Sequence, residues 1–302
     1  MLNLSTDTYT YIYIGDFSFS RSLVVQYGCR NVLATCYDSE GALHEKYPQA
    51  EGNVNDILDN NNNTQKNNED DSQTDDIHDE NEETNRIVLY SVDARKLGMV
   101  GGGGKMVRKG FRSSQSQRGG GGKAENSGPW DVICFNFPHV GGLSTDVNRQ
   151  VRSNQELLVA FFKACIPLLS ASSSTSDEPE HEHEEEEESD NGRRTHGQIL
   201  VTLFESEPYT LWNIKDLARH AGLRVITSFR FPWSSYHGYS HARTLGQIES
   251  KHGGGKGGWK GEDRLARMYV FDNVARASPS LTDGKPGGKR KRRSSSDSSD
   301  SE

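Results

Sequence analysis

The residues best suited to chemistry in this sequence are an amide, an aromatic ring and an imidazole that follow one short apolar run. Residues 132–135 (VICF) are typical of a strand buried on both faces, and Asn136, Phe137, Pro138 and His139 come directly after it. Pro138 fixes its own φ and restricts the residue before it, so this turn should be stiff. An amide beside an aromatic ring suits a flat, hydrogen-bonding substrate such as a nucleobase. Alternatively, Asn136 caps the next helix and Phe137 belongs to the core.

Acidic side chains stand at the ends of two other predicted strands. Residues 31–37 (NVLATCY) form a strand that ends at Asp38, 23 residues after Gly15. An acidic residue about 20 positions beyond the first turn accepts ribose hydroxyls in nucleoside-binding Rossmann-like units. The pair Asp38-Ser39 is also a suitable helix cap, so both interpretations stay open. A further strand, residues 86–92 (RIVLYSV), ends at Asp93.

The elements that must position these groups alternate along the chain. Residues 9–14 (YTYIYI) predict the first strand, and the turn GDFSFS leads into a helix that begins near Ser20, with Ser18 or Ser20 as its cap. Helical periodicity covers 148–169 and 210–221. Strands are predicted at 198–204, 223–231 and 266–271. This order favours an α/β fold with a doubly wound, mostly parallel sheet and an antiparallel final strand.

Composition predicts one domain with long interruptions. Only 32% of the residues are hydrophobic and 31 are glycine, so much of the chain is not core. We expect a single domain over residues 9–277 with disordered insertions at about 49–85, 98–128 and 170–196, and a disordered tail at 278–302. The Gly-rich insertion carries scattered Lys and Arg. It is either a mobile basic arm that contacts phosphates or a solvated linker.

The net charge of −8 is unevenly distributed, and the part of the chain that we expect to fold is basic. Outside residues 51–85, 172–196 and 278–302 the chain carries 17 acidic and 26 basic side chains. A basic folded body suits a nucleic-acid binder, because Lys and Arg release counterions from phosphates. The alternative is that these side chains only solvate the surface.

Several other classes of protein are disfavoured. The sequence has no apolar run of about 18 residues and no basic-then-apolar leader, so we expect neither membrane insertion nor secretion. The four cysteines lack CxxC spacing and indicate reduced core residues of an intracellular protein. His181 and His183 lie among solvated glutamates, so we expect no metal site.

Six motifs carry a family resemblance. They are GDFSFSRSL (15–23), ATCYDS (34–39), FNFPHVGG (135–142), NRQVRSNQELL (148–158), EPYTLWNIKDLARHAGL (207–223) and GYSHARTLG (238–246). With them the chain resembles the eukaryotic 25S ribosomal RNA (uridine-N3) methyltransferases, which have a Rossmann-like fold and use S-adenosylmethionine. The motifs are long and collinear, and the resemblance covers most of the chain outside the three low-complexity segments.

The resemblance implies roles for the residues at the strand ends. It places the carboxylates at the ribose and near the adenine of the cofactor, and the 136–139 turn around the target base. Residue by residue, it implies Gly15, Asp16 and Phe17 near the methionine part, Asp38 at the ribose, Asp93 near the adenine, and Asn136, Phe137, Pro138 and His139 in the base pocket.

The implied reaction requires the uracil N3 to displace the sulfonium methyl group and to lose its proton. The base must be single-stranded or extruded, and then held by stacking. We expect Phe137 and Tyr209 to stack on it, Asn136 to read its imide edge and His139 to accept the proton, unless His139 is a core or capping residue. The expected RNA contacts are Arg149, Arg152, Tyr209 and Trp212.

Two departures from the family pattern keep other functions open. Tyr13 stands where the family has the first Gly of its cofactor turn, and Glu205-Ser206 stands where the resemblance implies Lys and Gly. A side chain at the tight turn could crowd the cofactor. The alternatives are a cofactor-dead RNA-binding ribosome-assembly factor and a methyltransferase that acts on a different substrate.

The C-terminal tail predicts where the protein works. Residues 289–293 (KRKRR) form an exposed basic cluster that a nuclear import receptor can read, and Ser-acidic residues suited to phosphorylation follow it. The alternative is nonspecific RNA affinity. We therefore expect residence in the nucleus, specifically the nucleolus, with ribosomal RNA in the pre-ribosome as partner.

Overall fold

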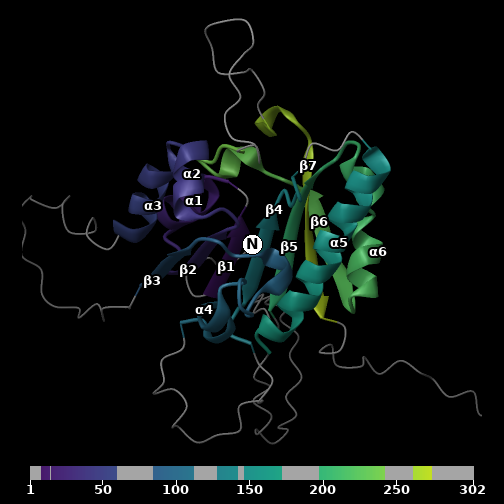
Figure 1. The fold of residues 1–302 in the computed structure, drawn as a ribbon, viewed down its shortest axis with the longest axis horizontal. Coiled ribbons are helices and arrows are strands. Elements are labelled where there is room, and N and C mark those ends of the chain that lie inside the picture. Colours follow the sequence, from purple (N-terminus) through teal and green to yellow (C-terminus); the bar gives the residue numbers. More distant parts are fainter. Residues whose placement is uncertain are drawn as a thin grey trace, which may run out of the picture.

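A seven-stranded sheet forms the centre of the molecule (Figure 1). The computed structural model describes residues 15–59, 84–111, 128–141, 146–171, 197–241 and 261–273, and the backbone of residues 8–13. The strand order is β3-β2-β1-β4-β5-β7-β6. The strands are β1 (Thr8–Tyr13), β2 (Asn31–Cys36), β3 (Asn85–Leu89), β4 (Val132–Asn136), β5 (Gln198–Phe204), β6 (Leu223–Arg230) and β7 (Ala266–Asn273).

The strand directions confirm the predicted fold class. Strands β1 to β5 pair in parallel, and β7 runs antiparallel to both β5 and β6. The sequence does not predict that β7 enters between β5 and β6, because strand order depends on long-range pairing. In this register Phe204 lies opposite Ala266, so β7 begins at the edge of the sheet where β1 to β5 end.

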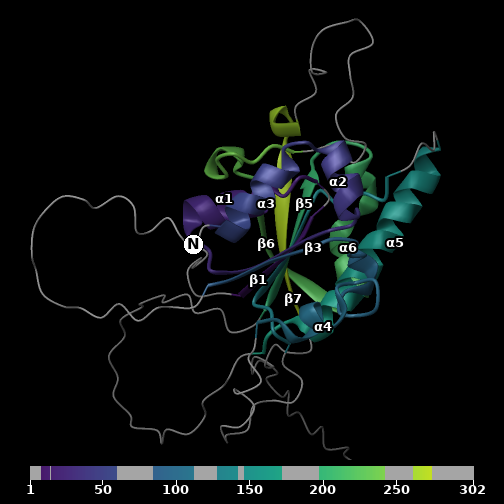
Figure 2. The same ribbon diagram turned by 60° about the vertical axis from the view of Figure 1, so that its left-hand side comes forward.

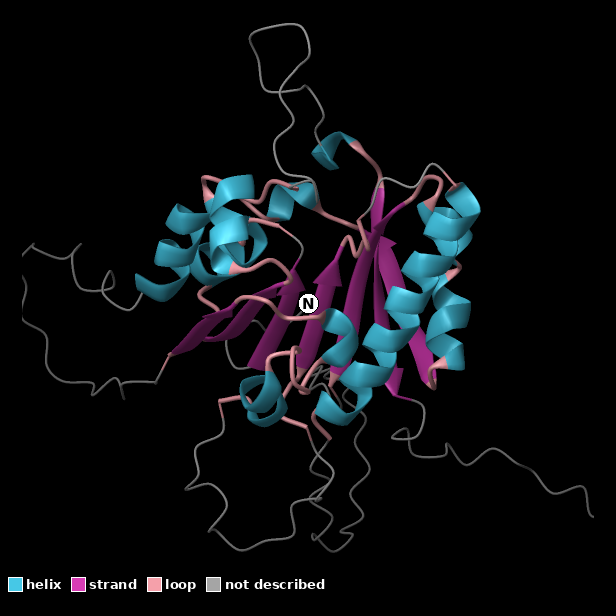
Figure 3. Ribbon diagram, in the orientation of Figure 1, coloured by secondary structure: helices cyan, strands magenta, loops and turns pink. Residues whose placement is uncertain are grey.

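Helices cover both faces of the sheet (Figures 2 and 3). One hydrophobic core lies under α1 (Ser18–Tyr27), α2 (Glu40–Lys46) and α3 (Ala50–Asp59). The other lies under α4 (Gly104–Lys109), α5 (Val147–Cys165) and α6 (Ile214–His220). Short 3-10 turns η2 (Ala94–Lys96), η4 (Ile166–Leu168), η5 (Tyr209–Trp212), η6 (Trp233–Ser235) and η7 (Gly261–Asp263) complete the described chain. None of the described helices is long and apolar enough to cross a membrane.

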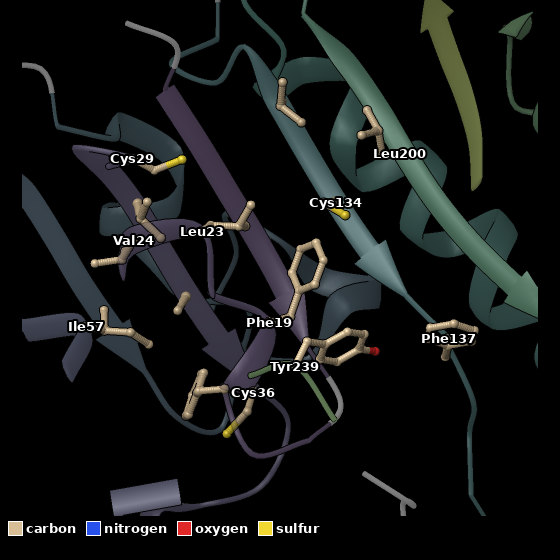
Figure 4. Close-up of a cluster of buried hydrophobic side chains, with 14 of the residues drawn as sticks. Phe19, Leu23, Val24, Cys29, Cys36, Ile57, Cys134, Phe137, Leu200 and Tyr239 are labelled. Carbon is tan, nitrogen blue, oxygen red and sulfur yellow. The ribbon is translucent and has the colours of Figure 1, made fainter. Parts of the chain in front are cut away.

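The start of the predicted insertion at 49–85 is folded, which corrects that boundary. Residues 50–59 form α3, and Ala50, Val54 and Ile57 are buried along one side of it. Ile57 points into the same cluster as Val24 and Cys36 (Figure 4). Three apolar residues at helical spacing are enough to hold this helix on the sheet, although its composition is otherwise polar. Residues 60–83 lie outside the described part of the chain.

The start of the predicted insertion at 98–128 is folded as well. Residues 98–111 form a packed turn and α4, in which Val107 is buried. The Trp130 indole N–H donates to the Val107 carbonyl at 2.6 Å, and Arg108 donates to the Gly98 carbonyl at 3.2 Å. The mobile-arm interpretation is therefore wrong for this part. Residues 112–127, and the third insertion at 172–196, lie outside the described residues.

Two helix starts differ from the prediction. Helix α1 begins at Ser18, and neither Ser18 nor Ser20 caps it, because Phe17 occupies the cap position with φ 64° and no side-chain hydrogen bond. The predicted helix at 210–221 is broken at Asn213, whose φ of 53° separates η5 from α6. Asn tolerates this left-handed conformation better than most residues, so the break falls there.

Candidate functional site

The turns that follow the parallel strands meet at the carboxyl edge of the sheet. Among the described residues, non-glycine residues with positive φ are Phe17, Ser91, Phe137 and Asn213. The first three lie in the turns after β1, β3 and β4. Each such residue costs about 1–3 kcal/mol, and strain of this kind concentrates at ligand-binding sites. The carboxyl edge is therefore the candidate site, in the place where open α/β sheets bind ligands.

The turn after β1 is closed by Asp16. Its carboxylate is buried and accepts hydrogen bonds from the Ser18 hydroxyl at 2.7 Å and the Gln49 amide at 2.7 Å. The Asn53 amide donates to its backbone carbonyl at 2.8 Å. Asp16 thus ties the turn to α3 and its preceding loop, and both of its oxygens are used within the chain. The Ser20 hydroxyl, also buried in this first helical turn, has no hydrogen-bond partner among the described residues.

Tyr13, which stands where the family has a Gly, does not disturb the register of the strands. Tyr13 is the last residue of β1, and its backbone pairs with Cys36 on one side and Asn136 on the other. The turn begins only at Gly15, whose φ of 151° a larger residue would rarely adopt. The residue that the backbone of this turn requires to be glycine is therefore present.

Asp38 lies after β2 and is held by a lysine. The Lys46 ammonium donates to Oδ1 of Asp38 at 2.6 Å, and the Asp38 side chain is one-fifth exposed. The cap of α2 is Ser39, whose hydroxyl accepts from the Ala42 N–H at 3.4 Å. The helix-cap alternative thus applies to Ser39 and leaves Asp38 available. Its Oδ2 accepts no hydrogen bond from the described residues, so a ligand hydroxyl has an acceptor here.

Asp93, after β3, forms its hydrogen bonds with Arg95, two residues further along the chain. It caps η2 through the Arg95 N–H at 2.9 Å, and the Arg95 guanidinium donates to both of its oxygens. The hydrogen bond from the Arg95 side chain holds the pKa of Asp93 below its ordinary value. Asp93 therefore acts as a cap and ion-pair partner in this structure, a role that the sequence analysis did not assign to it.

Asn136 ends β4 as a buried and only half-satisfied amide. The side chain is 2% exposed, and its Oδ1 accepts from the Thr202 hydroxyl at 2.6 Å and from the Cys134 thiol at 3.5 Å. Its Nδ2 has no hydrogen-bond partner among the described residues. A buried donor without an acceptor costs about 1–3 kcal/mol, so this amide is a group that a ligand oxygen would satisfy.

Phe137 is a core residue, which corrects its predicted role as a stacking surface. Its ring is 4% exposed, stacks on Trp233 at 5.4 Å, and lies 4.5 Å from the Phe204 ring and 4.4 Å from the His241 ring. Figure 4 shows it at the end of β4. Pro138 is buried beside it. The core alternative for Phe137 is thus the one that the structure displays.

The imidazole of His139 caps the turn that follows. Its Nδ1 accepts from the Gly141 N–H at 2.9 Å, and burial lowers the pKa of His139 below its ordinary value. The Val140 N–H donates to Oδ1 of the buried Asn154 at 3.0 Å, which fixes the turn on α5. The neutral ring keeps Nε2 without a hydrogen bond among the described residues. A neutral imidazole whose Nδ1 accepts carries its hydrogen on Nε2, so Nε2 can donate but not accept. Proton acceptance by His139 therefore requires Nδ1 to leave the Gly141 N–H.

The four expected RNA contacts divide into two kinds. Arg149 and Arg152 are exposed on α5 and remain available. Tyr209 is partly buried, with its ring 5.2 Å from Phe204 and 4.9 Å from Trp212. Trp212 is fully buried in the core under α5 and α6. The prediction that Trp212 contacts RNA is therefore wrong in this structure.

The sequence analysis missed a cation at this edge. The Arg264 guanidinium carbon lies 4.1 Å above the Phe204 ring centre and 5.4 Å from that of Tyr209, and its Nη2 donates to the Ser206 hydroxyl. The neighbouring Glu205 pairs with Arg267 at 2.6 Å, which neutralises the acidic departure. Nothing in the sequence signals Arg264, because it reaches the site from the start of β7.

The described residues contain no group of three or more metal-ligating side chains. His181 and His183 lie outside those residues.

Comparison with known proteins gives consistent matches. A family model described as BMT5-like, rRNA (uridine-N3-)-methyltransferase BTM5-like, matches residues 13–243. The chain is 26% identical over 280 residues to the 25S rRNA (uridine(2634)-N(3))-methyltransferase of Saccharomyces cerevisiae, covering 85% of this chain and 70% of that one. It is 24% identical over 236 residues to heavy metal-associated isoprenylated plant protein 41 of Arabidopsis thaliana, covering 77% and 32%. Among solved structures, TrmN from Thermus thermophilus aligns with a TM-score of 0.37 and 11% identity over 89% of this chain and 44% of that one.

Proposed function

The chain belongs to the BMT5-like family of rRNA (uridine-N3-)-methyltransferases, and from that premise we propose that it methylates N3 of a uridine in large-subunit, 25S-like ribosomal RNA. It is an S-adenosylmethionine-dependent methyltransferase. The roles of individual residues are proposals supported by the geometry at the carboxyl edge, and the proposed place of action is supported by the basic cluster at 289–293.

The observation that carries the proposal is the unpaired amide of Asn136. Uracil presents two carbonyl oxygens beside its N3–H, and an amide N–H that lacks an acceptor can donate to one of them. Thr202 fixes the orientation of the amide, so the donor is aimed before a ligand arrives. Alignment of the methyl donor with the nucleophile can be worth about 7 kcal/mol or more of a reaction barrier, and an oriented amide contributes to that alignment.

The chain's own residues fit the cofactor. Asp38 offers Oδ2 to the ribose hydroxyls while Lys46 holds Oδ1. The buried Ser20 hydroxyl, which has no partner among the described residues, lies in the helical turn after β1 and can bond to a polar group of the ligand. When bound, S-adenosylmethionine supplies an electrophilic methyl group on its sulfonium.

The remaining residues hold the base and its proton. Since Trp233 covers Phe137, the stacking residue that remains is the partly exposed Tyr209. His139 has a neutral ring and is the proposed proton acceptor, through Nδ1 once this atom leaves the Gly141 N–H. Arg149 and Arg152, exposed on α5, are the proposed contacts to the phosphates of the RNA.

The test uses the purified full-length chain with labelled S-adenosylmethionine and large-subunit rRNA transcripts. The expected product is N3-methyluridine, identified by mass spectrometry of the digested RNA. Micromolar cofactor binding without any methylated nucleoside would exclude rRNA as substrate and favour a different one. Absence of cofactor binding would support the RNA-binding assembly factor.

We propose that the protein acts in the nucleus, specifically the nucleolus, on the pre-ribosome. The basic cluster at 289–293, which lies outside the described residues, is the proposed import-receptor site. Deleting residues 288–302 from a fluorescent fusion should shift it toward the cytoplasm while cofactor binding in vitro persists. The single domain over residues 9–277 remains part of this proposal, with the folded additions of α3 and α4.

A further inference from the structure

Arg264 is fixed beside the candidate base pocket by three contacts. Its guanidinium lies over Phe204, which in turn packs on Phe137 directly after Asn136. Its Nη2 donates to the Ser206 hydroxyl, and its backbone carbonyl accepts from the Trp233 indole at 3.2 Å. The side chain is partly exposed, so the guanidinium is both positioned and open to a ligand.

The charge of Arg264 is not neutralised by a described carboxylate. Ser206 lies between Glu205 and Glu207, and Glu205 pairs with Arg267. Neither Glu207 nor Asp263 forms an ion pair with Arg264 among the described residues. Glu262 accepts from the backbone N–H of His241 at 2.7 Å and forms no ion pair with Arg264 among the described residues. The other titratable groups that face it are His241, which burial keeps neutral, and the Tyr209 phenol. The Arg264 guanidinium therefore has no ion-pair partner among the described residues, and its positive charge is available to a ligand.

A positive charge here has a specific use. Neutral uracil is a poor nucleophile at N3, and loss of the N3 proton leaves a negative charge shared between N3 and the two carbonyl oxygens. A guanidinium has five N–H donors in a planar fork, and Ser206 uses one of them. The others can bond to a uracil oxygen and leave N3 exposed to the methyl donor.

We propose that Arg264 binds a carbonyl oxygen of the target uracil and stabilises the N3-deprotonated base. The inference rests on the proposed function and deepens it. The N3 proton leaves to water, or to Nδ1 of His139 once this atom is released from the Gly141 N–H. The electron pair left on N3 forms the new N–C bond while the methyl–sulfur bond breaks, and its electrons stay on the sulfur.

The first test is a pH–rate profile of single-turnover methylation. Arg264→Gln should lower the rate at neutral pH about 100-fold, as for the loss of one charged donor at a developing anion. The deficit should shrink as the pH rises toward that at which uridine itself ionises. Arg264→Lys, which keeps the charge, should lose about 10-fold or less. Arg219→Gln removes the same charge from an exposed pair on α6 and should match the parent protein.

If Arg264→Gln lowers the rate by the same factor at every pH, the inference is wrong and Arg264 only packs on Phe204. Thermal unfolding of each variant separates this outcome from misfolding. If Arg264→Gln is folded and its loss of rate does not depend on pH, Arg264 has no electrostatic role in the reaction.

The second test reads the base directly and needs no methylation. A short single-stranded RNA with one 5-fluorouridine reports N3 ionisation through its fluorine resonance. Bound to the parent protein, this base should ionise at lower pH than in free RNA, and Arg264→Gln should abolish the difference. If the difference persists in the variant, Arg264 is not the cause. If the parent protein lowers the ionisation pH but makes no N3-methyluridine, the inference stands and the proposed reaction fails.

Discussion

The carboxyl edge has two halves, the turns after β2 and β3 and the turn after β4, and they hold their polar side chains in different ways. After β2 and β3, Asp38 and Asp93 pair with Lys46 and Arg95, whose side chains are 35% and 49% exposed. After β4, Asn136 is buried and its amide N–H has no described acceptor. Exposed ion pairs are worth about 0–1 kcal/mol, so a ligand can replace them cheaply. A buried donor without an acceptor lowers the stability of the fold until a ligand supplies the acceptor. The β4 half is therefore the stronger indication of a binding site.

The largest expected effect comes from the β4 half. Asn136→Ala should lower the rate of methyl transfer about 100- to 1000-fold, because it removes a preorganised donor. Cofactor affinity should change much less, since the proposed partner is the base. Single-turnover kinetics and isothermal titration measure the two quantities separately.

Thr202→Val is the matched control for this prediction. It leaves the amide in place but removes the hydroxyl that orients it, so a smaller loss of rate is expected. If Asn136→Ala lowers the melting temperature yet keeps full activity in the folded fraction, Asn136 is a core residue and the contrast between the halves disappears.

A smaller effect is expected in the β2–β3 half, where the two carboxylates should behave differently. Asp38→Ala should weaken cofactor binding by about 1.5–3 kcal/mol, the range for hydrogen bonds to a charged group, and leave the melting temperature of the cofactor-free protein nearly unchanged. Asp93→Ala should cost about 1 kcal/mol of stability through its lost cap, with a smaller effect on affinity. Equal losses of affinity in both variants would instead restore Asp93 to the cofactor site.

The sequence predicts the strands of the sheet well because each contains apolar, β-branched or aromatic residues in a short run. Residues 198–204 were predicted and observed as β5, and Asn136 ends β4 as the run VICF indicates. The polar residues at strand ends follow from the same runs. Composition gave a wrong prediction of disorder for α3, because a few buried apolar residues are enough to fold this helix. Its Val54 and Ile57 stand among Asn and Asp.

The part of the site that the sequence could not predict depends on packing between distant segments. Phe137 has the aromatic character of a stacking residue, and only the approach of Trp233 and His241 makes it core. Arg264 is ordinary in its own stretch of sequence and acquires a role because β7 starts beside Phe204. Local patterns carry no information on such contacts, which form across 60 or more positions of the chain.

The smallest expected effect is a difference between the halves in the pH dependence of stability. Burial, together with the charge of Arg264, lowers the pKa of His241 from 6.5 to about 3. Between these values the unfolded chain binds a proton that the folded chain does not, so the free energy of unfolding should decrease as the pH falls from about 6.5 toward 3. His241→Gln should flatten this decline, and the slope that remains includes His139, whose pKa is also lowered by burial.

Asp93 should act in a different window. Because its folded pKa is below 3.8, the stability that its pair with Arg95 contributes is present above about pH 4 and is lost only as the pH falls further. Asp93→Asn should therefore lower the free energy of unfolding by a constant amount between pH 6.5 and 4.5, leave the slope there unchanged, and alter the slope only at the acidic end. Urea unfolding at half-unit pH steps measures both variants against the parent protein. If His241→Gln keeps the full decline between pH 6.5 and 4.5, the imidazole is not held neutral beside Phe137, and the packing described for the β4 half is wrong.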